Sequence, residues 1–140
     1  MVDTWRGVIA TQPHLARYAM RTDGSPYPEY GAASRPRFVQ WINDLCAGDW
    51  DQEWLDYQET IGRRHTRAEK NKTDNADSPD HIPLRYVLGF LPVVILTTKD
   101  FLAKKGHSAD EVEAMHAAWT KALTLAVTIW TAAYTREGDW

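Results

Sequence analysis

Apolar residues recur every three to four positions along most of this chain, the spacing that places side chains on one face of an α-helix. No segment alternates apolar and polar residues for long enough to predict a β-strand. The pattern therefore predicts an all-α fold. Helices are expected over residues 2–10, 28–46, 51–64, 83–104 and 108–134, with a short additional helix opened by Pro13.

Local signals indicate where these helices begin, bend and end. Ser108 and Glu111 have the spacing of a capping box, so the last helix should begin there. Gly106 follows a helical segment that ends in Lys104, which is typical of a helix C-terminus. Pro36 lies inside the second long segment, where it should kink the helix.

One helical face ends in a histidine. Trp54, Gln58, Ile61 and His65 share this face, so the imidazole should point inward. Residues 66–80 contain almost no apolar side chain, and we expect them to form a solvated, mobile loop. On spacing alone, a histidine at a helix end more often stabilises the helix dipole or fills a half-buried slot than binds a metal.

Composition favours one globular domain over residues 1–140. The chain has 44% hydrophobic residues, seven Trp and six Tyr, which is enough to build a core and line a large flat pocket. The formal net charge is −3 and the Lys and Arg residues are scattered, so a nucleic-acid partner is not expected.

Cys46 is the only cysteine, so no intrachain disulfide can form and a reducing compartment is expected. We expect Cys46 to serve as inert packing. The apolar run at residues 87–96 is interrupted by Gly89 and Pro92 and looks too short to span a bilayer, and there is no signal-peptide pattern at the N-terminus. These features predict a soluble, cytoplasmic protein.

Other metal and hydrolytic sites have little support in the sequence. Asp74, Asp77 and Asp80 lack the glycine and the terminal glutamate of an EF-hand loop. No Ser, Cys and His fall into a nucleophile motif. The remaining histidines form no cluster at zinc spacing; they are His14, His81, His107 and His116.

Several segments together resemble the protoglobins, which are haem proteins related to the globin domains of globin-coupled sensors. The resemblance is carried by WLDYQETIGRRH at 54–65, KNKTDN at 70–75, HIPLRY at 81–86 and FLAKKGH at 101–107, with shorter matches over essentially the whole chain. It implies a globin-like helical fold that lacks the family's N-terminal extension and first helices. We therefore expect a truncated or naturally reduced chain with an exposed haem edge.

The resemblance also implies a haem b cofactor whose iron is ligated by His65. It places Tyr57 and Ile61 on the proximal face of the haem. The remaining implied haem neighbours are Ile82, Phe90 and Val94 at the flank, and Trp5, Arg6 and Phe38 on the distal side.

The distal side departs from the family. The resemblance implies a tyrosine where this chain has Arg6, and bulkier apolar residues where it has Ala19, Gly31 and Ser34. Ordinary drift with compensating packing is one interpretation. The other is an enlarged pocket, because each small residue removes volume above the iron.

Two functional classes follow from the resemblance. One is a protein that binds O2, CO or NO reversibly, or a gas-sensor domain. The other, which the small distal residues favour, is an engineered catalyst that transfers a carbene or nitrene from a small organic precursor and needs no acid or base residue. The resemblance also implies a homodimer formed through the last two long helices, although both of their apolar stripes could instead serve the core.

Overall fold

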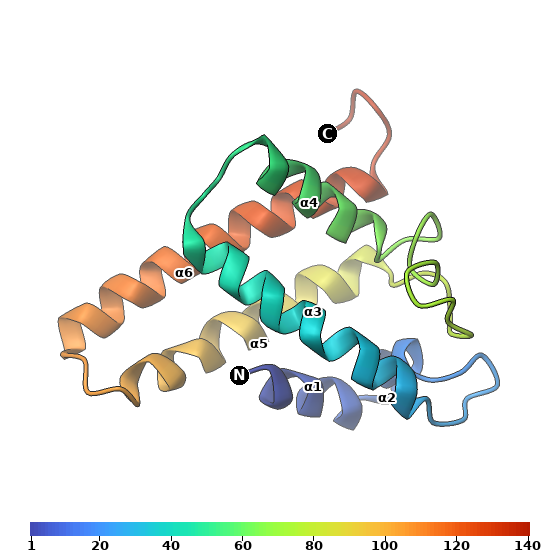
Figure 1. Ribbon diagram of the computed structural model, residues 1–140, viewed down its shortest axis with the longest axis horizontal. Coiled ribbons are helices and arrows are strands. Elements are labelled where there is room, and N and C mark those ends of the chain that lie inside the picture. Colours follow the sequence, from blue (N-terminus) through green and yellow to red (C-terminus); the bar gives the residue numbers. More distant parts are fainter.

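The computed structural model describes residues 1–140 and is all-helical, as the apolar spacing predicts (Figure 1). It contains six α-helices and two short 3-10 helices. In chain order these are α1 (Val2–Thr11), α2 (Pro13–Ala16), η1 (Arg17–Ala19), α3 (Pro28–Ala47), α4 (Gln52–Arg63), α5 (Leu84–Ala103), α6 (Ala109–Thr131) and η2 (Ala132–Tyr134).

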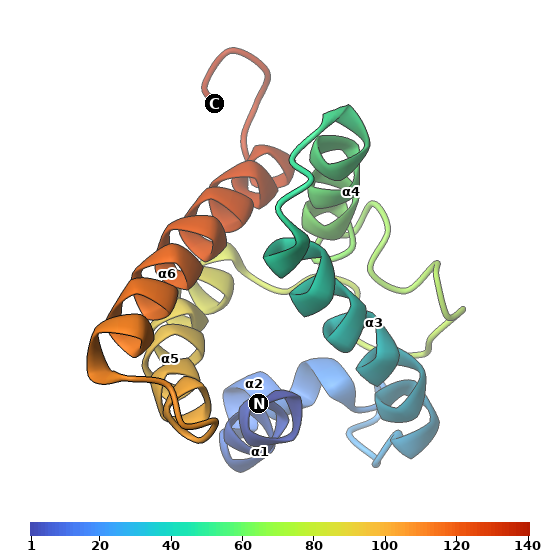
Figure 2. The same ribbon diagram turned by 60° about the vertical axis from the view of Figure 1, so that its left-hand side comes forward.

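The two most extensive helix–helix contacts are those of α5 with α6 and of α4 with α6. Helices α5 and α6 run antiparallel and are joined by a turn in which Gly106 has a positive φ of 78° (Figure 1). Helix α3 crosses the molecule between the end that holds α4 and the end that holds α1 and α2 (Figures 1 and 2). This arrangement leaves α1 and α4 at opposite ends.

Helix α6 carries most of the buried core. Its stripe of Trp119, Leu123, Val127 and Trp130 is 8% exposed or less at every position. Indole rings from other helices pack on it: Trp41 of α3 lies with its ring centroid 5.3 Å from that of Trp130. The burial of these aromatic side chains is a large share of the apolar area removed from water.

The helix-start signals are confirmed where a side chain caps the helix. The Ser108 hydroxyl accepts a hydrogen bond from the Glu111 backbone N–H, and the Glu111 carboxylate accepts one from the Ser108 N–H, which completes the capping box. Asp51 caps α4 by accepting from the Trp54 N–H at 2.9 Å. Helix α3 continues through Pro36 to Ala47.

The interpretation of the apolar run at 87–96 as too short to cross a membrane is wrong as far as length is concerned. The helix does not stop at Gly89 or Pro92. By length and composition alone, α5 is long enough and apolar enough to span a bilayer. One such helix is weak evidence for a membrane span, and α5 packs along α6, although few of its residues are fully buried. Its exposed face includes Leu88 and Leu96.

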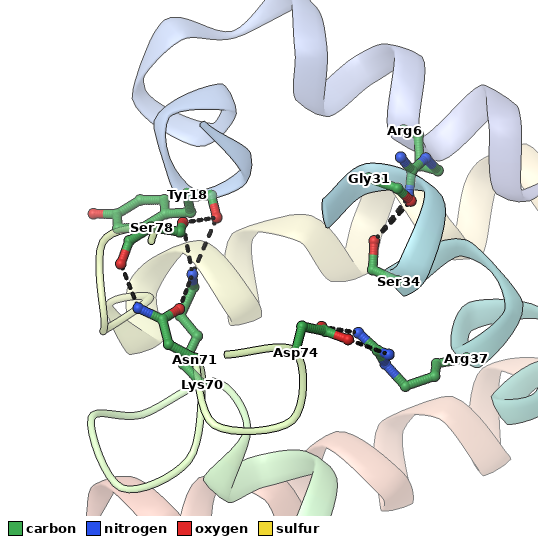
Figure 3. A network of polar contacts seen from close by, with 9 residues as sticks. All are labelled: Arg6, Tyr18, Gly31, Ser34, Arg37, Lys70, Asn71, Asp74 and Ser78. Carbon is green, nitrogen blue, oxygen red and sulfur yellow. Dashed lines mark hydrogen bonds and ion pairs between the residues drawn. The ribbon is translucent and has the colours of Figure 1, made fainter. Parts of the chain in front are cut away.

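The expectation that residues 66–80 form a solvated loop is also corrected, because several of their polar side chains are buried. Lys70 is 4% exposed and Ser78 is 2% exposed. The Lys70 ammonium donates to the Tyr18 carbonyl at 3.1 Å and to the Ser78 hydroxyl at 3.1 Å (Figure 3). These groups can be buried without an apolar stripe because they hydrogen-bond to one another and to the Tyr18 carbonyl.

Cys46 was expected to be packing, and this expectation is wrong. It lies in the last turn of α3 with its thiol side chain exposed. Gly48, with a positive φ of 79°, ends the helix two residues later, and the thiol at this end of α3 stays open to solvent.

Candidate functional site

A cavity of about 820 Å³ lies between the helices and is lined mainly by hydrophobic side chains. Helices α1, α3, α4, α5 and α6 all contribute to its walls. A largely apolar cavity of this size is in the range of sites for small molecules and cofactors.

His65 enters this cavity just after α4. Its Nδ1 lies 2.8 Å from the Ile61 carbonyl oxygen, which can only accept, so Nδ1–H donates and Nε2 keeps its lone pair. Burial lowers the pKa of His65 below its usual value and favours the neutral ring. A neutral imidazole with one nitrogen fixed and the other unblocked is the form that binds a metal.

The imidazole is held in place by the contact between α4 and α6. Its ring stacks on Trp130, with centroids 5.4 Å apart and planes 20° from parallel. Gly62 makes this approach possible, because a Cβ at this position would lie 2.7 Å from the Trp130 carbonyl oxygen and 2.8 Å from its Cα. The glycine therefore sets the distance at which His65 meets α6.

The backbone of His65 is anchored from the C-terminal side as well. The Ile82 N–H donates to the His65 carbonyl at 2.9 Å. The Tyr134 hydroxyl donates to the Ile82 carbonyl at 2.7 Å, and burial raises the pKa of this phenol. Residues 65, 82 and 134 thus form one hydrogen-bonded junction at the end of α4.

The wall formed by α1 and α3 is built differently. Trp5 is fully buried and donates through Nε1 to Thr97 at 2.7 Å. Arg6 reaches across to α3, where its Nη1 donates to the Ser34 hydroxyl at 3.1 Å (Figure 3). A Cβ on Gly31 would lie 2.8 Å from Arg6 Nη2. The volume that Gly31 releases is therefore taken by the guanidinium, which corrects the idea that every small residue on this wall enlarges the pocket.

All the charged side chains that line the cavity are basic, although the chain as a whole is acidic. Arg37 is neutralised by Asp74, which accepts from both of its terminal nitrogens (Figure 3). Desolvation lowers the pKa of Lys70 to about 8. Arg6 and Arg64 complete the set, and neither has a carboxylate within ion-pair distance.

The structure brings every site residue named from the sequence to this one cavity. His65, Tyr57 and Ile61 line it from α4 and the turn that follows. The others that line it are Trp5, Arg6, Ala19, Gly31, Ser34, Phe38, Ile82, Phe90 and Val94.

Sequence reasoning missed residues that support the site. Gly62 lies in the last turn of α4, three residues before His65, and a glycine inside a predicted helix is a sequence signal for close packing. Lys70 lies in a polar run that offers no such signal. Tyr134 lies far away in the sequence, and only the fold brings it to Ile82.

An all-helical chain folded in this order around an apolar cavity, with one histidine facing inward, is a globin-like protein. The family model of the protoglobins matches residues 1–140, so this chain belongs to the protoglobin family. None of the curated proteins matches the sequence. The family is one of haem proteins that bind or sense gases, and membership implies a haem cofactor.

The residues present fit a haem. The unblocked Nε2 of a neutral His65 is a suitable iron ligand, and the cavity walls are apolar and rich in aromatic rings. Haem also carries two carboxylates, and the cavity lining contains no acidic side chain that would repel them.

Proposed function

We propose that this protein binds haem b through His65 and takes O2, CO or NO on the side of the cavity that faces α1 and α3. The observation that carries the proposal is the hydrogen bond from His65 Nδ1 to the Ile61 carbonyl, which leaves Nε2 as the ligating atom. When bound, the haem supplies an iron that coordinates a diatomic gas reversibly.

The chain's own residues supply the shape and the apolar surroundings. Tyr57 and Ile61 lie on the His65 side, and Ile82, Phe90 and Val94 flank the cavity. Trp5 and Phe38 bound the opposite side, where their rings limit the entry of water.

The experiment is to load the purified protein with haem and to record absorption spectra of the ferric, ferrous and ferrous-CO forms. We expect one haem per chain and the spectrum of a histidine-ligated ferrous-CO complex. Failure to take up haem, or a CO spectrum equal to that of free haem, would contradict the proposal.

A second candidate is the transfer of a carbene or nitrene group to an organic acceptor. It is favoured by the cavity volume of about 820 Å³ and by Ala19 and Ser34 in its lining. A diazo ester would lose N2, and its carbene carbon would add to an alkene to form a cyclopropane. Cyclopropane in enantiomeric excess supports this function, and racemic product at the rate of free haem removes it.

We further propose a homodimer through α5 and α6. The exposed face of α5 carries Leu88 and Leu96, and Leu125 is 41% exposed on α6. Light scattering that gives a monomer mass would exclude the dimer, and Leu96→Glu should dissociate it.

We also propose a cytoplasmic location. The free, exposed thiol of Cys46 suits a reducing compartment.

A further inference from the structure

Arg6 is held in a defined position at the cavity by two residues of α3. Its Nη1 donates to Ser34 at 3.1 Å, and the Ser34 hydroxyl in turn donates to the Gly31 carbonyl at 3.1 Å (Figure 3). Its Nη2 occupies the space that a side chain on residue 31 would need. The Ser34 hydroxyl and the open space beside Gly31 thus orient the guanidinium, and no carboxylate takes part.

No carboxylate lies within ion-pair distance of Arg6. Asp3, the acidic residue one turn earlier on α1, is bound by Arg35 through two hydrogen bonds of 2.9 and 2.8 Å. Arg6 makes one hydrogen bond and no ion pair. Since a guanidinium has five N–H donors, four of them are left for something else.

Two of the other three cations of the cavity are already engaged by the protein. Arg37 is engaged by both oxygens of Asp74. The Lys70 ammonium donates to three partners, the Tyr18 carbonyl, Asn71 and Ser78, which uses all of its protons. Arg64 lies directly before His65 at the end of α4, and Arg6 comes from α1, so the two unpaired cations belong to different walls of the cavity.

Arg6 and His65 reach the cavity from two helices that do not lie side by side. Figures 1 and 2 both place α1, which carries Arg6, away from α4, which leads into His65, and both residues line the cavity. A group bound between them would meet the imidazole on one side and the guanidinium on the other.

We propose that Arg6, positioned by Ser34, makes this cavity selective for small monovalent anions, such as nitrite or azide, as ligands of the ferric haem. The proposal rests on the proposed haem function. A guanidinium binds such anions through short charge-assisted hydrogen bonds, whereas a neutral ligand of similar size gains little from it. The walls around Arg6 are largely apolar, so the charge is less screened than at the surface.

The test is a titration of the ferric, haem-loaded protein with sodium nitrite, sodium azide and imidazole at neutral pH and constant ionic strength, followed by absorption. Imidazole is the neutral reference ligand. The variants are Arg6→Leu, Arg6→Lys and Ser34→Ala. Arg64→Gln is the matched control, because it removes a cavity cation that Ser34 does not hold.

We expect Arg6→Leu to weaken nitrite and azide binding by roughly 10- to 100-fold, the usual effect of losing a hydrogen bond to a charged group, with imidazole affinity unchanged. Ser34→Ala and Arg6→Lys should each lose part of the anion affinity, because both disturb the orientation of the cation. Arg64→Gln should leave the ratio of anion to imidazole affinity as it is.

Equal anion affinities in the parent and Arg6→Leu would overturn the proposal. An Arg6→Leu variant that loses haem more readily but keeps its anion affinity would also overturn it, since Arg6 would then pair with a haem carboxylate. An equal loss of anion affinity in Arg64→Gln would mean that any cavity cation attracts the anion, and it would overturn the specific role of Arg6. Normal haem uptake and CO binding in these cases would leave the proposed function intact, while no haem uptake by the parent would overturn both.

Discussion

The two sides of the cavity are constructed in opposite ways. On the His65 side, α4 packs closely along α6, and Gly62 lets the backbones approach so that the imidazole stacks on Trp130. On the other side, α1 makes much sparser contact with α3, and the two helices meet through polar side chains: Arg6 donates to Ser34, and Arg35 binds Asp3.

In the two proposals above, the His65 side binds the cofactor and the Arg6 side selects its ligand. The position of His65 depends on backbone atoms and ring packing, which change only when the fold changes. On the other side, Arg6 is a flexible side chain with spare donors, so we expect its surroundings to change at little cost to stability. We therefore expect substitutions to have large effects on the first side and small ones on the second.

The largest effect is expected for His65→Ala. Removing the imidazole takes away the nitrogen proposed to ligate iron, so the histidine-ligated absorption spectrum should be lost. The matched control is His107→Ala, since His107 is exposed in the turn before α6. A His65→Ala protein with an unchanged ferrous-CO spectrum would show that another residue holds the cofactor.

Gly62→Ala should lower the free energy of unfolding by about 1–3 kcal/mol, the usual cost of overpacking. The new Cβ would meet backbone atoms of Trp130 at 2.7 and 2.8 Å, and backbone cannot rotate away. Urea unfolding at fixed haem content measures the change. Gly89→Ala is the control, because a Cβ there meets nothing within 4 Å, and it should gain about 0.5–1 kcal/mol from the better helix propensity of alanine.

Lys70 links the two sides, because it ties the loop after His65 to Tyr18 after α2, and its effect should depend on pH. Burial lowers its pKa to about 8 from 10.5, so between these values the unfolded chain holds a proton that the folded protein lacks. The free energy of unfolding should therefore rise with pH in this window, by up to about 1.4 kcal/mol per pH unit.

Urea unfolding of the parent and Lys70→Met across this window tests the point. The variant should lack this part of the slope. Tyrosines with raised pKa values act in the opposite direction at higher pH, but they do so in both proteins and cancel in the difference. Parallel slopes would mean that Lys70 is solvated in the folded state.

The smallest effect on stability is expected for Gly31→Ala. Its Cβ would approach only the end of the Arg6 side chain, which can move aside. We expect a change within about 1 kcal/mol, because the better helix propensity of alanine offsets the displacement. Thermal unfolding beside Gly62→Ala makes the comparison direct, and a loss as large as that of Gly62→Ala would show that the two sides are equally rigid.

Helix positions were accessible from the sequence because they depend on local chemistry. The capping box at Ser108 and Glu111 lies within one turn, and the structure confirms it. The burial of residues 66–80 was not accessible, because Lys70 is satisfied by the Tyr18 carbonyl, a backbone atom 52 residues earlier. No periodic pattern reports a contact of that kind.

The orientation of His65 toward the inside followed from its spacing with Trp54, Gln58 and Ile61. The stacking of its ring on Trp130 did not, since that depends on the packing of α4 against α6. The exposure of Cys46 was missed for a related reason: a small apolar residue at a helix end is buried only if another element covers it.

The sequence alone was sufficient for the all-α class, the caps, the inward face of α4 and the resemblance to protoglobins, because these depend on residue types at short spacings. Only the tertiary structure decided which cations of the cavity are neutralised, where the volume released by Gly31 went, and how His65 is held. Each of these depends on atoms from helices far apart in the chain, and their relative positions are set by packing.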